Sequence, residues 1–385
     1  MRPETTSRLI VVFGIALYAL VGWLFLDVES QWKAVLLAGA VIATLLVAER
    51  MGWRRRFETA AAEYGTLAST LSLVAVAIIA VILHESHFAL LMLATVALYA
   101  TACLGLTVQF GYAGVANFAG AAFFGIGCYT AAMLGTHTPL PHLLNVVAGG
   151  AMAALIGSIL ILPILRTRGH YAALITIAFG ILFKTFLEVN DTLGGPQGLK
   201  VPGMKILAWS FNDPIHLPGG IEASFYLNYV VLAVALAFAA YVLVKRMESS
   251  WIGLSFDALR LDETAAAVSG IDIAKWKILA FVLGNFLAGT AGAVYAMMSG
   301  FIAPNSFTFG DSLILVSIVI LGGVGNPLGV IPACLLLLVL PEKLQAIQEY
   351  RFLIYALLVI LILLFRPEGL LPRRMRQYFS RRVGT

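Results

Sequence analysis

Residues 88–108 read FALLMLATVALYATACLGLTV, a stretch of 21 residues without one charged side chain. A helix needs about 20 mainly apolar residues to cross the hydrocarbon core of a membrane, so this stretch predicts a transmembrane helix. Eleven further apolar runs accompany it, several of them too short to span alone: 9–26, 34–48, 67–83, 118–135, 143–165, 171–187, 225–244, 277–299, 312–324, 327–340 and 351–365. The pattern predicts an all-α, polytopic helical membrane protein with about 10–12 transmembrane segments, some of them broken helices.

The composition supports the same class. Of the 385 residues, 61% are apolar and 12% are charged, and the mean hydropathy is +0.94. A soluble domain is about 45–50% apolar and 25% charged, so a soluble enzyme, a nucleic-acid binder, a secreted disulfide scaffold and a disordered chain are excluded. A β-barrel is excluded because its strands alternate in polarity. The three cysteines lie inside apolar runs without CxxC spacing, and neither a metal site nor a disulfide framework is predicted.

Lys and Arg residues are unevenly distributed between alternate loops. With the N terminus inside, 19 of the 25 fall on the cytoplasmic side, whereas the 20 acidic residues divide evenly. Cytoplasmic loops of membrane proteins carry an excess of Lys and Arg, and acidic residues contribute little to orientation. The distribution predicts an N-in, C-in topology among membrane lipids, and it explains the net charge of +5 without a nucleic-acid partner.

Two uncharged, glycine-rich stretches interrupt the apolar runs. Residues 111–120 read GYAGVANFAG and residues 322–329 read GGVGNPLG. Interrupted segments in corresponding halves of a transporter point to its transport site, and irregular backbone at membrane depth must be surrounded by protein or a watery cavity. The first stretch is either a broken helix that lines the pathway or a tight cytoplasmic turn. The candidate substrate-pathway residues are Gly111, Gly114, Asn117, Gly322, Gly323, Gly325 and Asn326.

The cytoplasmic segment 245–277 contains an amphipathic pattern. Residues spaced by 4, 3, 4 and 3 positions place one apolar face on a helix, opposite a polar face with Asp257, Arg260 and Thr264; the apolar residues are Leu254, Ala258, Leu261, Ala265 and Val268. The pattern predicts a short helix outside the membrane, which either lies on the bilayer or docks a cytoplasmic partner. The acidic pair Asp262 and Glu263 disfavours an anionic membrane surface. A C-terminal cap at Gly270 and an N-cap at Asp272 complete the pattern.

Ionisable residues are scarce within the spans. Lys184 has Glu188 four residues further on, which fits a structural pair or a snorkelling lysine, although a lysine in a span is also a functional candidate. No carboxylate lies mid-membrane, which argues against a proton- or sodium-coupled carrier. The sequence has no HExxH or GxSxG motif and no paired aspartates, so no catalytic residue is predicted. It also has no phosphate-binding GxxxxGK[ST] loop.

Several motifs together resemble the permease subunits of branched-chain amino acid ABC importers of the LivM type. They are GYAGVANFAGAAFFGIGCYTAAML, LRTRGHYAALITIAFG followed by TLGGPQGL, ALRLDETAAAVSGI, and VILGGVGNPLG leading to LLFRPEGLLP, and they extend over roughly residues 88–372. The resemblance implies a permease core at 67–372 with a cytoplasmic coupling segment at 245–277. Residues 1–66 would be an N-terminal extension with two extra spans and a basic cytoplasmic loop, and residues 373–385 a basic cytoplasmic tail.

The resemblance also implies a role and partners. The chain would be one half of a heterodimeric pore with a second homologous permease subunit, two cytoplasmic ATP-binding subunits and a periplasmic or extracellular solute-binding protein. It would be a multi-pass protein of the bacterial cytoplasmic (inner) membrane and not itself an enzyme. It would carry no cofactor, because ATP and Mg²⁺ would bind the partner ATPases. The helix near 256–269 would be the coupling helix, with these residues at the ATPase: Asp257, Arg260, Asp262, Glu263, Thr264 and Gly270.

One departure from the family leaves the cargo open. After Gly114 the family often has Gln-x-Ser-x-Gly-His, whereas this sequence has Val115, Asn117, Ala119 and Gly120 at those positions. Branched-chain amino acids are the default cargo, and urea, short amides, other amino acids or small carboxylates are alternatives. A self-sufficient channel or secondary carrier, which would transport without ATP, is the alternative function. An intramembrane enzyme would need convergent catalytic groups that the sequence does not supply.

Overall fold

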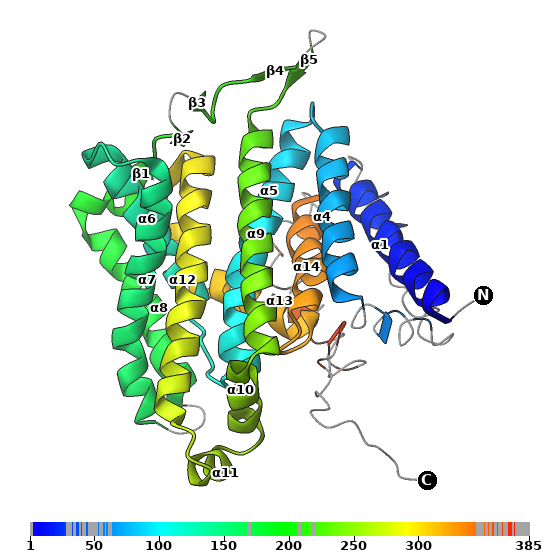
Figure 1. Ribbon diagram of the computed structural model, residues 1–385. Helices are drawn as coiled ribbons and strands as arrows, with labels where there is room; N and C mark the ends of the chain where they lie inside the picture. The colour runs from blue at the N-terminus through cyan, green and yellow to red at the C-terminus, as the bar shows by residue number, and fades with distance from the viewer. Residues whose placement is uncertain are drawn as a thin grey trace.

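The computed structural model describes residues 3–27, 64–167, 171–206, 209–217 and 221–343, with isolated positions between 33 and 60 and between 350 and 373. Its long elements are helices (Figure 1): α1 Pro3–Asp27, α4 Gly65–Ile82, α5 His87–Leu106, the π-helix η1 Thr107–Tyr112, α6 Gly120–His137, α7 His142–Leu165, α8 Tyr171–Val189, α9 Tyr226–Ser249, α10 Trp251–Leu261, α11 Glu263–Val268, α12 Ile273–Ser299, α13 Phe309–Gly322, α14 Pro327–Cys334, the π-helix η5 Leu335–Val339 and α15 Leu340–Lys343.

The helices confirm the predicted class of polytopic membrane protein. Among the described residues, 7 helices are long and apolar enough to cross a membrane: α1, α5 continued by η1, α7, α8, α9, α12, and α13 with the short helix before it. The predicted runs 34–48 and 351–365 lie largely outside the described residues. The remaining predicted runs correspond to α4, to α6 and to the sequence of short helices from α14 to α15.

Helix α12 lies at the centre of the bundle and packs against α7, α6 and α5. Glycines bring the backbones together. A Cβ atom on Gly105 of α5 would lie 2.4 Å from the carbonyl oxygen of Gly284, and one on Gly127 of α6 would lie 2.0 Å from that of Gly289. A Cβ atom on Gly150 of α7 would lie 2.5 Å from the Thr290 methyl group. Small residues permit such close helix packing in membranes, and they leave no room for a solute where these helices touch.

Two short hairpins and one pair of sequence-distant strands mark the end of the bundle opposite α10 and α11 (Figure 1). The antiparallel pairs are β1 (Leu199–Lys200) with β6 (Phe301–Ile302), β2 (Lys205–Ile206) with β3 (Trp209–Ser210), and β4 (Ile215–Leu217) with β5 (Ile221–Ala223). The 3₁₀ turns η2 (Asp191–Leu193), η3 (Gly195–Gln197) and η4 (Pro304–Ser306) complete this end. The start of α1 lies toward the other end of the bundle, the end that carries α10 and α11 (Figure 1).

The N-terminal helix is attached to the rest of the bundle at its outer end. The ammonium group of Lys343 donates a hydrogen bond of 2.9 Å to the carbonyl oxygen of Leu26, in the last turn of α1. The same ammonium group lies 5.0 Å from the centre of the Phe88 ring at the start of α5. Cations are favoured at helix C-termini, where carbonyl groups lack intrahelical partners. Lys343 is 9% exposed, so this contact is a buried one.

The cytoplasmic segment differs from the single helix that the sequence pattern predicts. The helix breaks at Asp262, whose backbone is extended and whose side chain accepts hydrogen bonds from the amides of Thr264 and Ala265. Asp262 is therefore the N-cap of α11, a position that Asp strongly favours. Asp272 caps α12 as predicted, by accepting from the amide of Lys275. Gly270 follows α11 with a φ of +84°, a conformation that suits glycine after a helix end.

Candidate functional site

The first glycine-rich stretch begins inside a π-helix. Helix α5 widens into η1 at Thr107, and the chain then leaves helical geometry from Ala113 until α6 begins at Gly120. Gly114 has a φ of +66°, which glycine adopts without strain. Single turns of π-helix often occur at functional sites. The structure therefore shows a helix, a break and a second helix in this stretch.

Asn117 lies in a buried cluster of three side-chain amides. Its Nδ2 donates to Gln109 Oε1 at 2.8 Å and to Asn285 Oδ1 at 3.1 Å, and its Oδ1 accepts from the amide of Ala119 at 2.9 Å. Gln109 Nε2 donates to Asn285 Oδ1 and to the carbonyl oxygen of Phe281, both at 3.0 Å. The three amide residues are 0–1% exposed. Because buried polar groups need hydrogen bonds, this cluster fixes the irregular segment against α12.

The amide cluster lies at the depth of the middle of a membrane helix. Asn285 is 12 residues after Ile273 and 14 before Ser299, the two ends of α12. At 1.5 Å per residue it is about 18 Å from one end of the helix and 21 Å from the other. Asn117 is thus held near mid-span, where protein surrounds the irregular backbone as the membrane requires. This geometry favours the broken helix over the cytoplasmic turn.

The second glycine-rich stretch joins α13 to α14. Gly323 and Gly325 have φ values of +107° and +88°, so the chain turns through conformations that favour glycine. Asn326 caps α14 by accepting from the amide of Leu328 at 3.1 Å. A Cβ atom on Gly322 would lie 2.6 Å from the carbonyl oxygen of Gly329, so the two helices meet at closest approach here. The residues predicted in this stretch form one tight turn.

The structure brings the two predicted stretches into contact. A Cβ atom on Gly111 would lie 2.3 Å from the Cα atom and 2.5 Å from the backbone nitrogen of Gly325. On its other side, a Cβ atom on Gly325 would lie 3.0 Å from the guanidinium of Arg260 in α10. Arg260 of the predicted coupling helix therefore lies beside the turn at Gly325, and that turn touches Gly111 of the first glycine-rich stretch. Asn117, in contrast, lies deeper, in the amide cluster.

Arg373 contacts residues from several elements at this end of the bundle. We call this group the cytoplasmic junction, and it consists of Arg373 with Tyr112, Glu248, Asp257 and Gly325. Its guanidinium donates to Asp257 Oδ1 at 2.5 Å, lies 4.0 Å from Glu248 Oε1, and stacks 4.5 Å from the centre of the Tyr112 ring. The side chain of Arg373 is 10% exposed, and those of Asp257 and Glu248 are 18% and 9% exposed. A planar guanidinium suits this combination of ion pairing and stacking.

The pKa of the Arg260 guanidinium is affected by the charged residues of the same junction. Burial, and then the positive charge of Arg373, lower the pKa of the Arg260 guanidinium, while Asp257 and Tyr112 act in the opposite direction. Arginine stays charged in proteins, so both guanidinium groups are cations. The carboxylate of Asp257 lies among them and offsets their repulsion.

The other predicted coupling residues lie on α11 or at its ends, away from the junction. Asp262 and Thr264 form the N-terminal cap described above, and Gly270 follows the C-terminus. Glu263 accepts a hydrogen bond of 2.6 Å from the ammonium of Lys277 on α12. All four residues are exposed, and the Lys277 partner of Glu263 is partly buried. They occupy the surface at the cytoplasmic end of the bundle.

The apolar face predicted for this segment points outward. Leu254, Leu261 and Val268 are 50%, 66% and 86% exposed, whereas Phe256 and Leu259 of α10 are buried. Phe256 is buried by aromatic packing, because the centre of its ring lies 6.2 Å from that of Tyr112 and 5.5 Å from that of Trp276. The periodicity thus identified a real apolar face, and that face has no covering among the described residues.

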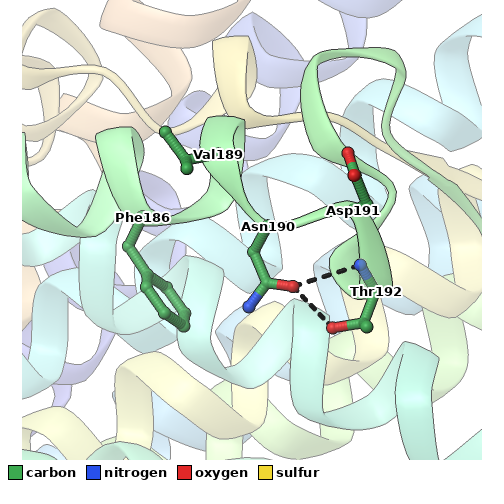
Figure 2. A pocket seen from close by; sticks show the side chains of 5 residues that line it. All are labelled: Phe186, Val189, Asn190, Asp191 and Thr192. Atoms are coloured by element: carbon green, nitrogen blue, oxygen red, sulfur yellow. Dashed lines mark hydrogen bonds between the residues drawn. The ribbon is translucent and has the colours of Figure 1, made fainter.

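A separate pocket of about 290 Å³ opens at the outer end of α8 (Figure 2). It is lined by Phe186, Val189, Asn190, Asp191 and Thr192. Asn190 Oδ1 accepts hydrogen bonds from the amide of Thr192 at 3.1 Å and from its hydroxyl at 2.5 Å. In Figure 2 the carboxylate of Asp191 points away from the Phe186 ring, so the lining groups do not converge on a common point. None of the predicted site residues lines this pocket.

Three residues of these sites were missed by the sequence analysis. Gln109 and Asn285 are amides inside long apolar spans, and polar groups at membrane depth are expected to be functional or paired. The presence of an amide in each of these spans is therefore the sequence feature that could have identified Gln109 and Asn285. Arg373 had been placed in the basic tail, and nothing in its immediate sequence distinguishes it from Arg374 or Arg376.

The ionisable pair within α8 has a plain arrangement. Lys184 Nζ lies 3.2 Å from Glu188 Oε1, and both side chains are about one third exposed. This is the structural pair that the i,i+4 spacing allows. In the part of the chain that the structure describes, no group of three or more His, Cys, Asp and Glu side chains is placed to hold a metal ion.

The spanning helices and the helix break that holds Asn117 near mid-span are those of a multi-pass membrane protein. The chain belongs to the family described as the permease component of the branched-chain amino acid transport system, which matches residues 88–365. Both glycine-rich stretches, the amide cluster and the segment from α10 to α11 lie within that range. The permease class and the family expected from the motifs are therefore confirmed.

Curated relatives agree with this membership. The chain is 33% identical over 282 residues to the high-affinity branched-chain amino acid transport system permease protein LivM of Escherichia coli K12, covering 70% of this chain and 66% of the relative. It is 24% identical over 327 residues to a probable LivM of Methanocaldococcus jannaschii, covering 72% and 91%. It is 24% identical over 290 residues to LivH of Salmonella typhimurium, covering 71% and 91%. No solved structure shows a significant match.

Proposed function

We propose that this chain is one half of a heterodimeric pore in an ATP-driven importer of branched-chain amino acids. A second homologous permease forms the other half, two cytoplasmic subunits bind ATP and Mg²⁺, and an external solute-binding protein delivers the solute. The chain itself hydrolyses nothing. The LivM and LivH relatives are two different permease proteins of one transport system by name, which supports pairing with a second permease.

The observation that carries the coupling to ATPases is the exposed apolar face of α10 and α11. Leu254, Leu261 and Val268 are each at least half exposed at the cytoplasmic end of the bundle. Large apolar side chains exposed outside the spanning helices mark candidate interaction sites, and the adjoining charges of Asp262 and Glu263 disfavour an anionic bilayer as the partner. A cytoplasmic protein is the partner that fits.

The close packing around α12 supports a pore shared between two chains. Gly105, Gly127 and Gly150 bring α5, α6 and α7 into backbone contact with α12, which leaves no path for a solute between them. The pathway then runs along a surface that a second permease completes. We assign to it the seven candidate residues of the two glycine-rich stretches. Of these, Gly114 is exposed, whereas Asn117 is buried at mid-span, so its amide would reach a solute only after a rearrangement of η1 against α12.

Reconstitution tests this function. The chain is co-expressed with its neighbouring transport genes, purified in nanodiscs, and assayed for ATP hydrolysis with a panel of solute-loaded binding proteins. Co-purified ATPases stimulated by a binding protein loaded with leucine, isoleucine or valine support the proposal. Stimulation by another loaded protein would change the cargo to urea, a short amide or another amino acid. Uptake by the chain alone, without ATP, would replace the importer by a channel or secondary carrier.

A further inference from the structure

We propose that Arg373 is a positioning residue that fixes α10 to the turn at Gly325, so that a displacement of α10 is transmitted to the first glycine-rich stretch. The proposal rests on the importer function, because a partner ATPase must supply the displacement. Arg373 lies 116 residues from Asp257 in sequence and contacts α9, α10 and η1 with one side chain.

The backbone that precedes Arg373 is anchored to the second glycine-rich stretch. The amide of Leu370 donates to the carbonyl oxygen of Leu321 at 2.7 Å, and the amide of Leu371 donates to that of Gly322 at 3.1 Å. Asn326 Nδ2 donates to the carbonyl oxygen of Leu371 at 3.0 Å. Three hydrogen bonds thus hold this short segment against the end of α13 and the turn that follows it.

The side chain of Arg373 reaches from that anchor to the cytoplasmic helices. Its ion pair with Asp257 ties it to α10, and the nearby carboxylate of Glu248 adds the last turn of α9. These groups are less than one fifth exposed, so water screens their interaction weakly. Removal of one partner from a buried ion pair leaves an uncompensated charge, which is strongly unfavourable.

Packing contacts connect α10 to Gly111 and Tyr112 at the start of the first glycine-rich stretch. A Cβ atom on Gly325 would lie 2.8 Å from Arg373 Cδ, and the far side of Gly325 touches Gly111. The Tyr112 ring lies against the guanidinium of Arg373 and against Phe256 of α10. Close-packed layers transmit a displacement because they cannot be compressed. A movement of α10 is therefore imposed on Gly111 and Tyr112, which lead into the segment that holds Asn117.

The decisive measurement is the stimulation of ATP hydrolysis by a loaded binding protein in the reconstituted complex. The variant Arg373→Gln removes the charge and leaves a shorter, uncharged polar side chain. We expect it to retain basal hydrolysis while stimulation falls about 5-fold or more, the lower range of coupling between sites. Arg373→Lys is also expected to lose stimulation, because lysine lacks the planar fork. The matched control is Arg246→Gln, which changes an exposed cation of α9 that is not one of the residues defining the junction.

A cross-link separates attachment from overall stability. In Asp257→Cys with Arg373→Cys, a short bis-maleimide replaces the ion pair by a covalent bridge; the native cysteines Cys103, Cys128 and Cys334 are buried. Stimulation that is low before and restored after cross-linking supports the proposal, even if Arg373→Gln assembles poorly. Full stimulation in Arg373→Gln, or no recovery in a cross-linked complex that remains assembled, overturns it. Absence of stimulation in the unaltered complex would instead contradict the importer function.

Discussion

Gly111 and Gly325 touch through their backbones, although they belong to two stretches more than 200 residues apart. The Cα atom of Gly325 fills the space that a side chain on Gly111 would occupy. This contact joins the break after α5 to the turn after α13. It is the place where the two stretches predicted as a transport site actually meet.

Replacement of Gly111 tests that contact. In Gly111→Ala the new methyl group meets backbone atoms at 2.3 and 2.5 Å, so the two segments must move apart. We expect a loss of about 1–3 kcal/mol in the free energy of unfolding, typical of overpacking, and impaired transport. The measurement is thermal unfolding in nanodiscs together with uptake. The control is Gly180→Ala in α8, where the methyl group would meet a single atom at 4.0 Å; equal behaviour of both variants would contradict the prediction.

Asn117 combines a structural and a proposed pathway role, and two variants distinguish them. Asn117→Leu leaves Gln109 Oε1 and the amide of Ala119 without their partner, so we expect destabilisation of about 1–3 kcal/mol and impaired transport in a complex that still assembles. Gln109→Leu disrupts the same cluster from η1. A change in the apparent KM for uptake in Asn117→Leu alone supports a pathway role. Unchanged uptake kinetics would remove Asn117 from the pathway.

The outward apolar face makes a prediction about ATPase binding. Leu261→Ser with Val268→Ser removes apolar surface that is already exposed, so thermal stability is expected to stay unchanged. Full burial of one leucine or valine side chain against a partner contributes about 1.5–3 kcal/mol. A loss of about 1.4 kcal/mol in binding free energy already weakens association with the ATPase tenfold. Less ATPase should therefore co-purify. Val189→Ser, a 78% exposed residue at the outer end of α8, is the control; equal ATPase recovery in both would refute this docking face.

The charged pairs of α10 and α11 give a separate prediction. Arg260→Glu together with Glu263→Lys reverses two charges at the proposed ATPase surface. We expect the complex to insert and hydrolyse ATP, but to lose its stimulation by the loaded binding protein. Loss of the exposed Glu263–Lys277 pair should itself change stability by less than about 1 kcal/mol. If uptake and stimulated hydrolysis both survive, these residues do not couple transport to the ATPases.

Lys343 provides a prediction about the N-terminal helix. Lys343→Met keeps the aliphatic stem but removes the hydrogen bond to Leu26 and the cation beside Phe88. Hydrogen bonds to charged groups contribute about 1.5–3 kcal/mol, so α1 should become easier to separate from the bundle. Hydrogen exchange in α1 measures this directly. Lys200→Met, which alters an exposed lysine of β1, should leave exchange in α1 unchanged.

Local composition was sufficient to predict the helices. Runs such as 143–165 and 225–244 correspond to α7 and α9, because apolar side chains over about 20 residues have one stable state in a bilayer. The break at Asp262 was not predicted, since the apolar spacing continues across it and only the cap chemistry of Asp262 interrupts the helix. The domain boundaries proposed at residues 66 and 372 stay predictions.

The arrangement of the candidate site depended on contacts that no local pattern contains. Asn117 was identified as an unusual polar residue, but its partners Gln109 and Asn285 are set by the packing of η1 on α12. Arg373 is one of several arginines in a basic tail, and its role arises only from the fold that brings α10 to it. Sequence periodicity also identified the face with Leu261 and Val268 without indicating whether it points inward or outward, because a partner and a core both favour apolar residues.

The position of Arg373 has a consequence for the order in which the protein matures. Synthesis proceeds from the N terminus, so Tyr112, Glu248 and Asp257 are made well before Arg373 exists. At 5–20 residues per second, the 116 residues between Asp257 and Arg373 take roughly 6–23 s to make. Arg373 also follows every apolar run of the sequence. The nascent permease therefore holds an incomplete set of charges at this junction until the segment that carries Arg373 has emerged from the ribosome.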